Sequence, residues 1–178
     1  GYLAAGEEDG ILRTFLQLGT VLGRMGHRAP LAGLLEQCVG RYPEERATDD
    51  IPPLQAAVPE RLRGLLAVLA GASVTAINHF KRAQAPLRDS GESRLVIDND
   101  LDLALAATAA GEASVAAAAL TDAGGEEALG RSPLLESRLE LARHALWLAE
   151  SGGSAEPAAA ATWPTKLRAV VDAAADAD

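Results

Sequence analysis

The chain has 178 residues, of which 48% are hydrophobic but only 3% aromatic, so its apolar content is mainly alanine, leucine and valine. This composition favours packed helices over a sheet, because strands favour β-branched and aromatic side chains. The formal net charge of -9 argues against nucleic acid and an anionic membrane surface as partners. We therefore expect an all-α protein with a protein or peptide partner.

Targeting and redox signals are sparse. The single cysteine, Cys38, excludes an internal disulfide framework and any multi-cysteine metal site. No signal peptide or uninterrupted membrane-length apolar run appears, so we expect a cytoplasmic protein without a membrane partner. The chain begins with Gly1 rather than Met, which we interpret as a fragment of a larger protein or a processed chain.

Apolar residues recur with the helical period of 3.6 in eight segments. These are residues 11–25, 30–41, 57–70, 73–86, 99–110, 112–122, 133–151 and 164–176. Gly26, Gly71 and Gly111 stand where a left-handed cap ends a helix. Pro59 is expected in the first turn of the third helix, and Pro133 at the first position of the seventh.

The segments between the helices are polar or rich in glycine and proline. Residues 41–53, 86–93 and 122–132 are predicted to be loops, and residues 151–163 a flexible linker. We expect one helical domain over residues 1–150. Residues 164–178 would then form a C-terminal helix that either caps this domain or is mobile.

Small residues recur at the same positions in three helix pairs. Gly19, Gly64 and Ala104 occupy one phase, and Gly26, Gly71 and Gly111 follow seven residues later in each pair. A mid-helix glycine costs about 1 kcal/mol relative to alanine. We expect Gly19 and Gly64 to lie where the first helix of a pair closely approaches the second.

This pattern resembles the tetratricopeptide repeat (TPR), an antiparallel helix pair of about 34 residues, over roughly residues 12–128. The units lie at about 12–45, 57–90 and 97–130, with a partial fourth helix at 133–151. Their spacing, about 45 and then 40 residues, predicts irregular loops in a short stacked α-solenoid. The alternative fold is a generic helical bundle. The residues matched to repeat packing are Phe15, Leu18, Gly19, Gly26, Leu35, Gly64, Gly71, Ala76, Phe80, Ala83, Gly111, Ala116 and Leu120.

The resemblance implies that the first helices of successive pairs line a concave groove, which takes up a peptide or a partner helix. The groove positions carried over to this chain are Arg13, Leu16, Gln17, Thr20, Arg24, Arg61, Leu65, Val68, Asp98, Leu101 and Leu105. Helical spacing alone also places Arg13, Gln17, Thr20 and Arg24 on one face. The alternative is that the two arginines are merely solvated.

Catalytic and metal-binding motifs are missing from the sequence. His27, His79 and His144 lack ligand partners at metal spacing. We interpret His27 and His79 as surface residues and Cys38 as a buried, inert thiol. No phosphate-binding glycine loop or nucleophile elbow occurs. We therefore expect no enzymatic activity, no cofactor and no metal.

Three alternating aspartates, Asp98, Asp100 and Asp102, begin like a calcium loop. The sixth position of such a loop is Leu103 instead of glycine, and the twelfth is Ala109 instead of glutamate, which excludes an EF-hand. We interpret the aspartates as acidic caps at the N-terminus of the helix over 99–110.

The sequence therefore predicts a non-catalytic interaction scaffold or regulatory module. We expect it to be part of a larger bacterial signalling or transcription-regulating protein. The alternative is a structural domain that forms a homo-oligomer through the open end of its stack. An ordered helix over 164–176 that covers this end would favour the first reading.

Overall fold

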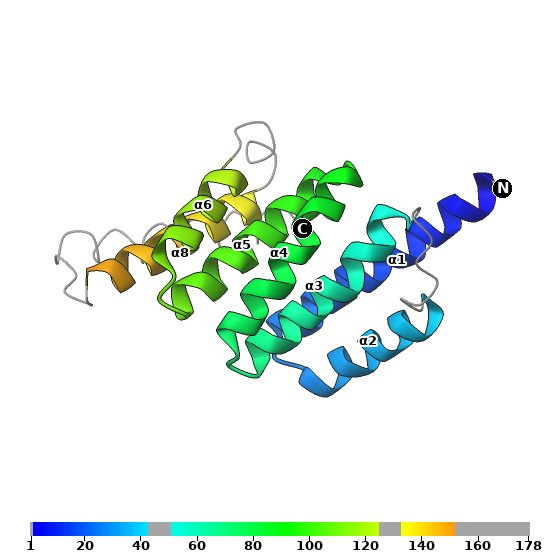
Figure 1. The fold of residues 1–178 in the computed structure, drawn as a ribbon, viewed down its shortest axis with the longest axis horizontal. Helices are drawn as coiled ribbons and strands as arrows, with labels where there is room; N and C mark the ends of the chain where they lie inside the picture. The colour runs from blue at the N-terminus through cyan, green and yellow to red at the C-terminus, as the bar shows by residue number, and fades with distance from the viewer. Residues whose placement is uncertain (1, 43–50, 125–132, 152–178) are drawn as a thin grey trace. The chain divides into compact units, whose positions relative to one another are not determined.

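The computed structural model describes residues 2–42, 51–124 and 133–151, and within these ranges the chain forms seven helices and no strand, which confirms the all-α prediction (Figure 1). The helices are α1 (Tyr2–Arg24), α2 (Arg28–Arg41), α3 (Pro53–Leu69), α4 (Ser73–Asp89), α5 (Ser93–Ala109), α6 (Ala113–Ala123) and α8 (Pro133–Glu150). The predicted helix over 164–176 and nearly all of the predicted linker lie outside the described residues. Contacts divide the chain into two compact units between Asn99 and Asp100, inside α5.

In the first unit α3 is the central helix, because it contacts α1, α2 and α4, while α1 also contacts α2 (Figure 1). The helix buries apolar residues along most of its length. Leu62 and Val58 of α3, Leu12 and Leu16 of α1, and Phe80 of α4 are almost completely buried. Burial of such side chains contributes about 1.5–3 kcal/mol each, which makes this layer the core of the unit.

Glycines end four of the helices in the left-handed conformation. Gly26, Gly71 and Gly111 have φ angles of 74°, 72° and 76°, as the sequence predicts, and Gly91 has 72°. In the first of these turns the His27 N–H donates to the Leu22 carbonyl over 2.9 Å, which closes the end of α1. Each turn therefore reverses the chain with only three residues between consecutive helices.

Two prolines lie inside helices, contrary to prediction. Helix α3 begins at Pro53, whose fixed φ suits the first turn, so Pro59 lies in mid-helix and is buried. Pro86 does not open a loop over 86–93. Helix α4 continues to Asp89, because Leu87 is fully buried and the Ser90 N–H donates to the Pro86 carbonyl over 3.1 Å.

The predicted close approach occurs at both mid-helix glycines. A Cβ atom on Gly64 would lie 2.5 Å from the ring of Phe80, so α3 meets α4 there, the second helix of its own pair. A Cβ atom on Gly19 would collide with Leu62 of α3, while Leu34 and Leu31 of α2 lie at 3.5 and 3.6 Å. The expectation for Gly19 is thus corrected: its tightest neighbour belongs to the next helix pair.

The remaining packing positions divide between core and surface. Ala76, Phe80, Ala83, Ala116 and Leu120 are buried as predicted. The prediction is wrong for Leu18, which is 45% exposed because it faces away from α3. Leu35 and Phe15 are half-buried, and Leu31 and Leu34 fill the core side of α2.

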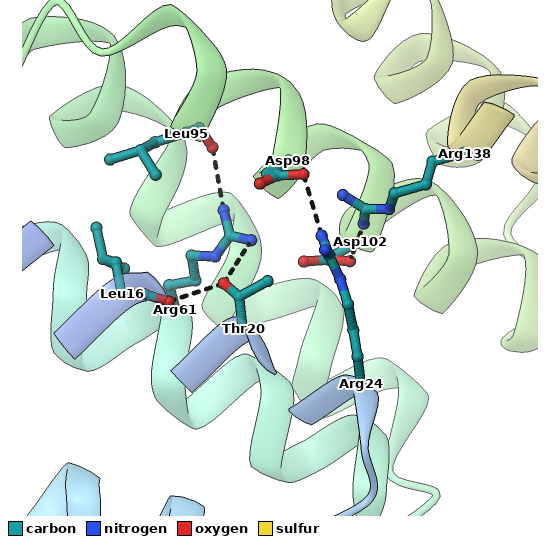
Figure 2. A network of polar contacts seen from close by, with 8 residues as sticks. All are labelled: Leu16, Thr20, Arg24, Arg61, Leu95, Asp98, Asp102 and Arg138. Atoms are coloured by element: carbon teal, nitrogen blue, oxygen red, sulfur yellow. Dashed lines mark hydrogen bonds and ion pairs between the residues drawn. The ribbon is translucent and has the colours of Figure 1, made fainter. Parts of the chain in front are cut away.

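In the second unit α6 and α8 pack against each other. Buried residues of α8 recur along one face, and those of α6 are mostly alanines. They are Leu135, Leu139, Ala142 and Leu146 in α8, and Ala116, Ala119, Leu120 and Ala123 in α6. Arg138 of α8 donates to Asp102 of α5 over 2.7 Å (Figure 2).

The three aspartates of α5 do not cap a helix. Helix α5 begins at Ser93, so Asp98, Asp100 and Asp102 lie well inside it. Asp98 and Asp102 pair with arginines of other helices, and Asp100 is fully buried. The capping interpretation is wrong because the apolar face of the helix continues backwards to Ile97, which is buried.

Candidate interaction surface

A buried arginine connects three helices of the first unit. Arg61 of α3 has no exposed surface, and it donates from Nη1 to the Leu95 carbonyl of α5 over 3.0 Å (Figure 2). Its Nη2 donates to Thr20 Oγ1 of α1 over 3.4 Å, and Thr20 donates to the Leu16 carbonyl over 2.8 Å. A buried charge is tolerated only with such partners, so Arg61 fixes how α1, α3 and α5 meet.

Two ion pairs join α1 to the start of α5. Arg24 contacts Asp98 at 3.1 Å (Figure 2), and Arg13 contacts Glu92, just before α5, at 2.6 Å. The arginine side chains are 40% and 49% exposed, so each pair contributes at most about 1 kcal/mol. These pairs matter because the two arginines, which the sequence predicts to contact a partner, instead pair with acidic residues of the same chain.

Several predicted groove residues thus lie close together in the structure, but they do not form an open groove. The predicted positions that are buried, and so do not line a surface, are Leu16, Thr20, Arg61, Leu65 and Leu101. Asp98 and Leu105 are half-buried, while Arg13, Gln17, Arg24 and Val68 are exposed. The prediction is wrong for the five buried positions. The first four of these lie in the packed core of α1 and α3 instead of on a surface.

An exposed apolar stripe runs along the side of α1 that is opposite the predicted groove face. We call it the α1 seam and define it as Ile11, Phe15, Leu18, Val21 and Met25. Leu18, Val21 and Met25 are 45%, 50% and 63% exposed, and the other two are half-buried. Successive members are three or four residues apart, so they share one face of the helix. Contiguous apolar surface of this kind marks interaction sites.

A hollow of about 270 Å³ lies beside the seam, between α1 and α2. It is lined by Ile11, Thr14, Phe15, Leu18, Leu34 and Gln37. The volume is just below the roughly 300–1,000 Å³ of small-molecule sites, so it suits individual side chains of a partner better than a ligand. On α2, Gly33 and Gly40 have no atom within 4 Å of a Cβ position, which leaves room beside the helix.

A second hollow, of about 320 Å³, has mixed charge. Glu8, Asp9 and Asp89 contribute carboxylates to it, Arg13 contributes a cation, and Pro52 and Pro53 form part of its wall. Since Arg13 already pairs with Glu92, its cation is not available to an anionic ligand in this hollow. The α1 seam is the stronger candidate surface.

The titratable groups show one local cluster, between α3 and α4. Glu60 accepts hydrogen bonds from Arg63 at 2.7 Å and lies 3.0 Å from His79 Nδ1. Burial alone would raise the pKa of Glu60, but the hydrogen bonds from His79 and Arg63 hold it below its ordinary value. Ion pairing of this kind stabilises the contact between α3 and α4, and no nucleophile adjoins it among the contacts of the described residues.

The remaining candidate residues are Cys38 and two of the histidines. Cys38 is fully buried, as predicted from the sequence, and this burial raises the pKa of its thiol to about 11. His27 is exposed, and His144 stacks on Trp147 with ring centroids 5.6 Å apart. Within residues 2–42, 51–124 and 133–151, no three His, Cys, Asp or Glu side chains cluster as metal ligands. Nor is any helix of that part of the chain long and apolar enough to cross a bilayer.

Sequence reasoning missed the α1 seam. The signal was present, because α1 carries two apolar stripes: one includes Leu12 and Leu16, and the other is the seam. The repeat pattern predicts packing for Phe15 and Leu18 of the seam and a groove position for Leu16. Such a pattern does not distinguish a helix with neighbours on two sides from a helix with one uncovered side.

The comparisons with known proteins give no relative. No protein-family model, curated protein or solved structure matches the chain.

Proposed function

We propose that the chain is a non-catalytic interaction scaffold, a short TPR-like stack of helix pairs that binds an amphipathic helix on the α1 seam. The observation that carries this proposal is the exposed apolar seam beside the hollow between α1 and α2. An amphipathic helix presents anchors at three- and four-residue spacing, which is the spacing of the seam itself.

The TPR-like stacking is supported by two contacts of the first unit and by the helix ends. Phe80 packs on Gly64 within one helix pair, and Gly19 of the preceding pair approaches Leu62. The left-handed Gly26, Gly71 and Gly111 each end the first helix of a pair. Successive first helices α1 and α3 are also in contact. Stacked pairs of this kind bury a continuous core and leave their outer helix faces available for binding.

The absence of catalytic function is also part of the proposal. Two buried groups of the first unit that could carry chemistry, Arg61 and Cys38, have no exposed surface, and Arg61 is held by hydrogen bonds. General acid–base or nucleophilic catalysis requires such groups in reach of a substrate. A scaffold that only binds a partner requires a complementary shape and exposed apolar surface.

The proposal is tested by selecting binders from a displayed library of helical peptides on the purified chain. We expect selected peptides to carry an apolar stripe, and we expect Leu18→Arg to weaken their binding by about tenfold or more. The matched control is Val74→Arg, because Val74 of α4 is also apolar and is 64% exposed but lies outside the seam. Selected peptides that bind Leu18→Arg as well as the parent chain would overturn the proposal.

A further inference from the structure

We propose that the partner of the α1 seam is a second copy of this chain, which docks its own α1 in antiparallel orientation about a twofold axis near Leu18. This inference depends on the proposed function, since it names the occupant of the same surface. It rests on the order of apolar residues along α1 and on the charges at the two ends of the helix.

The seam is nearly symmetric about Leu18. Ile11 and Met25 lie seven residues to either side of it, and Phe15 and Val21 lie three residues to either side. At 1.5 Å per residue, Ile11 and Met25 are each about 10 Å from Leu18 along the axis. An antiparallel second copy would therefore place Met25 opposite Ile11 and Phe15 opposite Val21, twice in one interface.

The ends of the helix have opposite charge. Glu7 and Glu8 are exposed near the beginning of the seam, whereas Arg28, the first residue of α2, is exposed just past the turn that follows its end. Antiparallel pairing brings the acidic end of α1 in one copy towards the end of α1 in the other copy, where the turn into α2 presents Arg28. Parallel pairing would place like charges together, which is unfavourable. The helix dipoles favour the same choice.

The hollow gives the second copy a place to insert a side chain. Met25 is the most exposed large apolar residue of the seam, at 63%, and Ile11 lines the hollow. In the antiparallel arrangement Met25 of each copy reaches the Ile11 end of the other copy's hollow. A flexible methionine adapts well to an irregular apolar hollow.

Disulfide trapping tests both the partner and its orientation. We would prepare Ile11→Cys and Met25→Cys chains, mix them and oxidise them with copper phenanthroline. The native Cys38 is fully buried and does not interfere. We expect a disulfide-linked heterodimer from the mixture and little linked product from either chain alone, because a disulfide needs Cα atoms within about 7 Å.

The controls define what would overturn the inference. Linked product from Ile11→Cys alone at the level of the mixture would show parallel pairing, and linkage no greater than that of Val74→Cys would show no such pairing. Sedimentation equilibrium is the second readout: the parent chain should self-associate, and Leu18→Arg should weaken association by about tenfold or more. A monomeric parent chain that still binds selected helical peptides through Leu18 would overturn the inference that the partner is a second copy, and it would leave the proposed function standing. If neither self-association nor peptide binding depends on Leu18, both the inference and the proposed function fail.

Discussion

Helices α1 and α3 are both rich in apolar residues, but only α3 is surrounded by its own chain. α3 contacts α1, α2 and α4 and buries nine of its residues, including Arg61 and Gly64. α1 buries Leu12 and Leu16 on the side facing α3 and leaves the α1 seam exposed. Two helices that are similarly rich in apolar residues therefore differ in how much of their apolar surface is buried. The helix in the middle of the layer is covered by its neighbours, whereas the helix at the side keeps one apolar face exposed. The exposed apolar residues of α1 form the surface that we propose for binding.

The strongest test of α3 as the connecting helix is Arg61→Ala. This change removes the guanidinium that holds the Leu95 carbonyl and Thr20, and it leaves a cavity among buried residues. We expect a loss of about 3–5 kcal/mol in the free energy of unfolding, measured by urea denaturation. Arg61→Met, which keeps most of the buried volume, should lose clearly less. Equal losses would show that the hydrogen bonds add nothing to packing.

The two faces of α1 are compared directly by Leu16→Ala and Leu18→Ala. Leu16 is fully buried, so its truncation should cost about 2–5 kcal/mol. Leu18 is 45% exposed, so its truncation should change stability by about 0.5 kcal/mol or less. Urea denaturation of both variants checks the difference. Similar losses at the two positions would contradict the assignment of one face to the core and the other to solvent.

Glycine-to-alanine changes test which helix faces are covered. In Gly64→Ala the new methyl group meets the Phe80 ring, and we expect a net loss of about 1–3 kcal/mol. In Gly33→Ala the methyl group enters open space on α2, so we expect a gain of about 0.5–1 kcal/mol from helix propensity. Thermal and urea unfolding measure both. A gain at Gly64 would show that α3 and α4 are not in close contact there.

The smallest expected effect is the pH dependence of the contact between α3 and α4. The folded-state pKa of Glu60 lies below its ordinary value of 4.5, so its contribution is present above that pH and is lost as pH falls through the folded-state pKa. After allowance for solvent screening we expect under about 1 kcal/mol. Glu60→Gln should remove this part of the stability loss below pH 4.5. An unchanged acid profile in the variant would exclude the role of Glu60.

Much of the fold follows from the sequence because helix ends have local causes. The left-handed glycines Gly26, Gly71 and Gly111 terminate helices as predicted, and Pro133 begins α8. The errors at Pro59 and Pro86 have a common cause, since tertiary burial keeps a helix intact across a proline that local rules place at a boundary.

The proposed binding surface was harder to predict than the helices. Spacing correctly grouped Arg13, Thr20 and Arg24 on one face of α1, but it did not reveal that Glu92, Arg61 and Asp98 of the same chain engage them. Periodicity predicts on which face of a helix a residue lies, but it does not predict which residue of another helix contacts it. For the same reason Leu18 was assigned to packing, although the structure leaves its side of α1 uncovered.

The most direct test of the account is the solvent accessibility of leucine methyl groups, measured by NMR with a soluble paramagnetic agent. In dilute solution the Leu18 methyl signals should be strongly relaxed, whereas those of Leu12 and Leu16 should not. Relaxation at Leu18 should then fall as the chain is concentrated or as a selected helical peptide is added. Leu18 methyl groups as protected as those of Leu16 in dilute solution, or unaffected by concentration and peptide, would contradict the α1 seam as a binding surface.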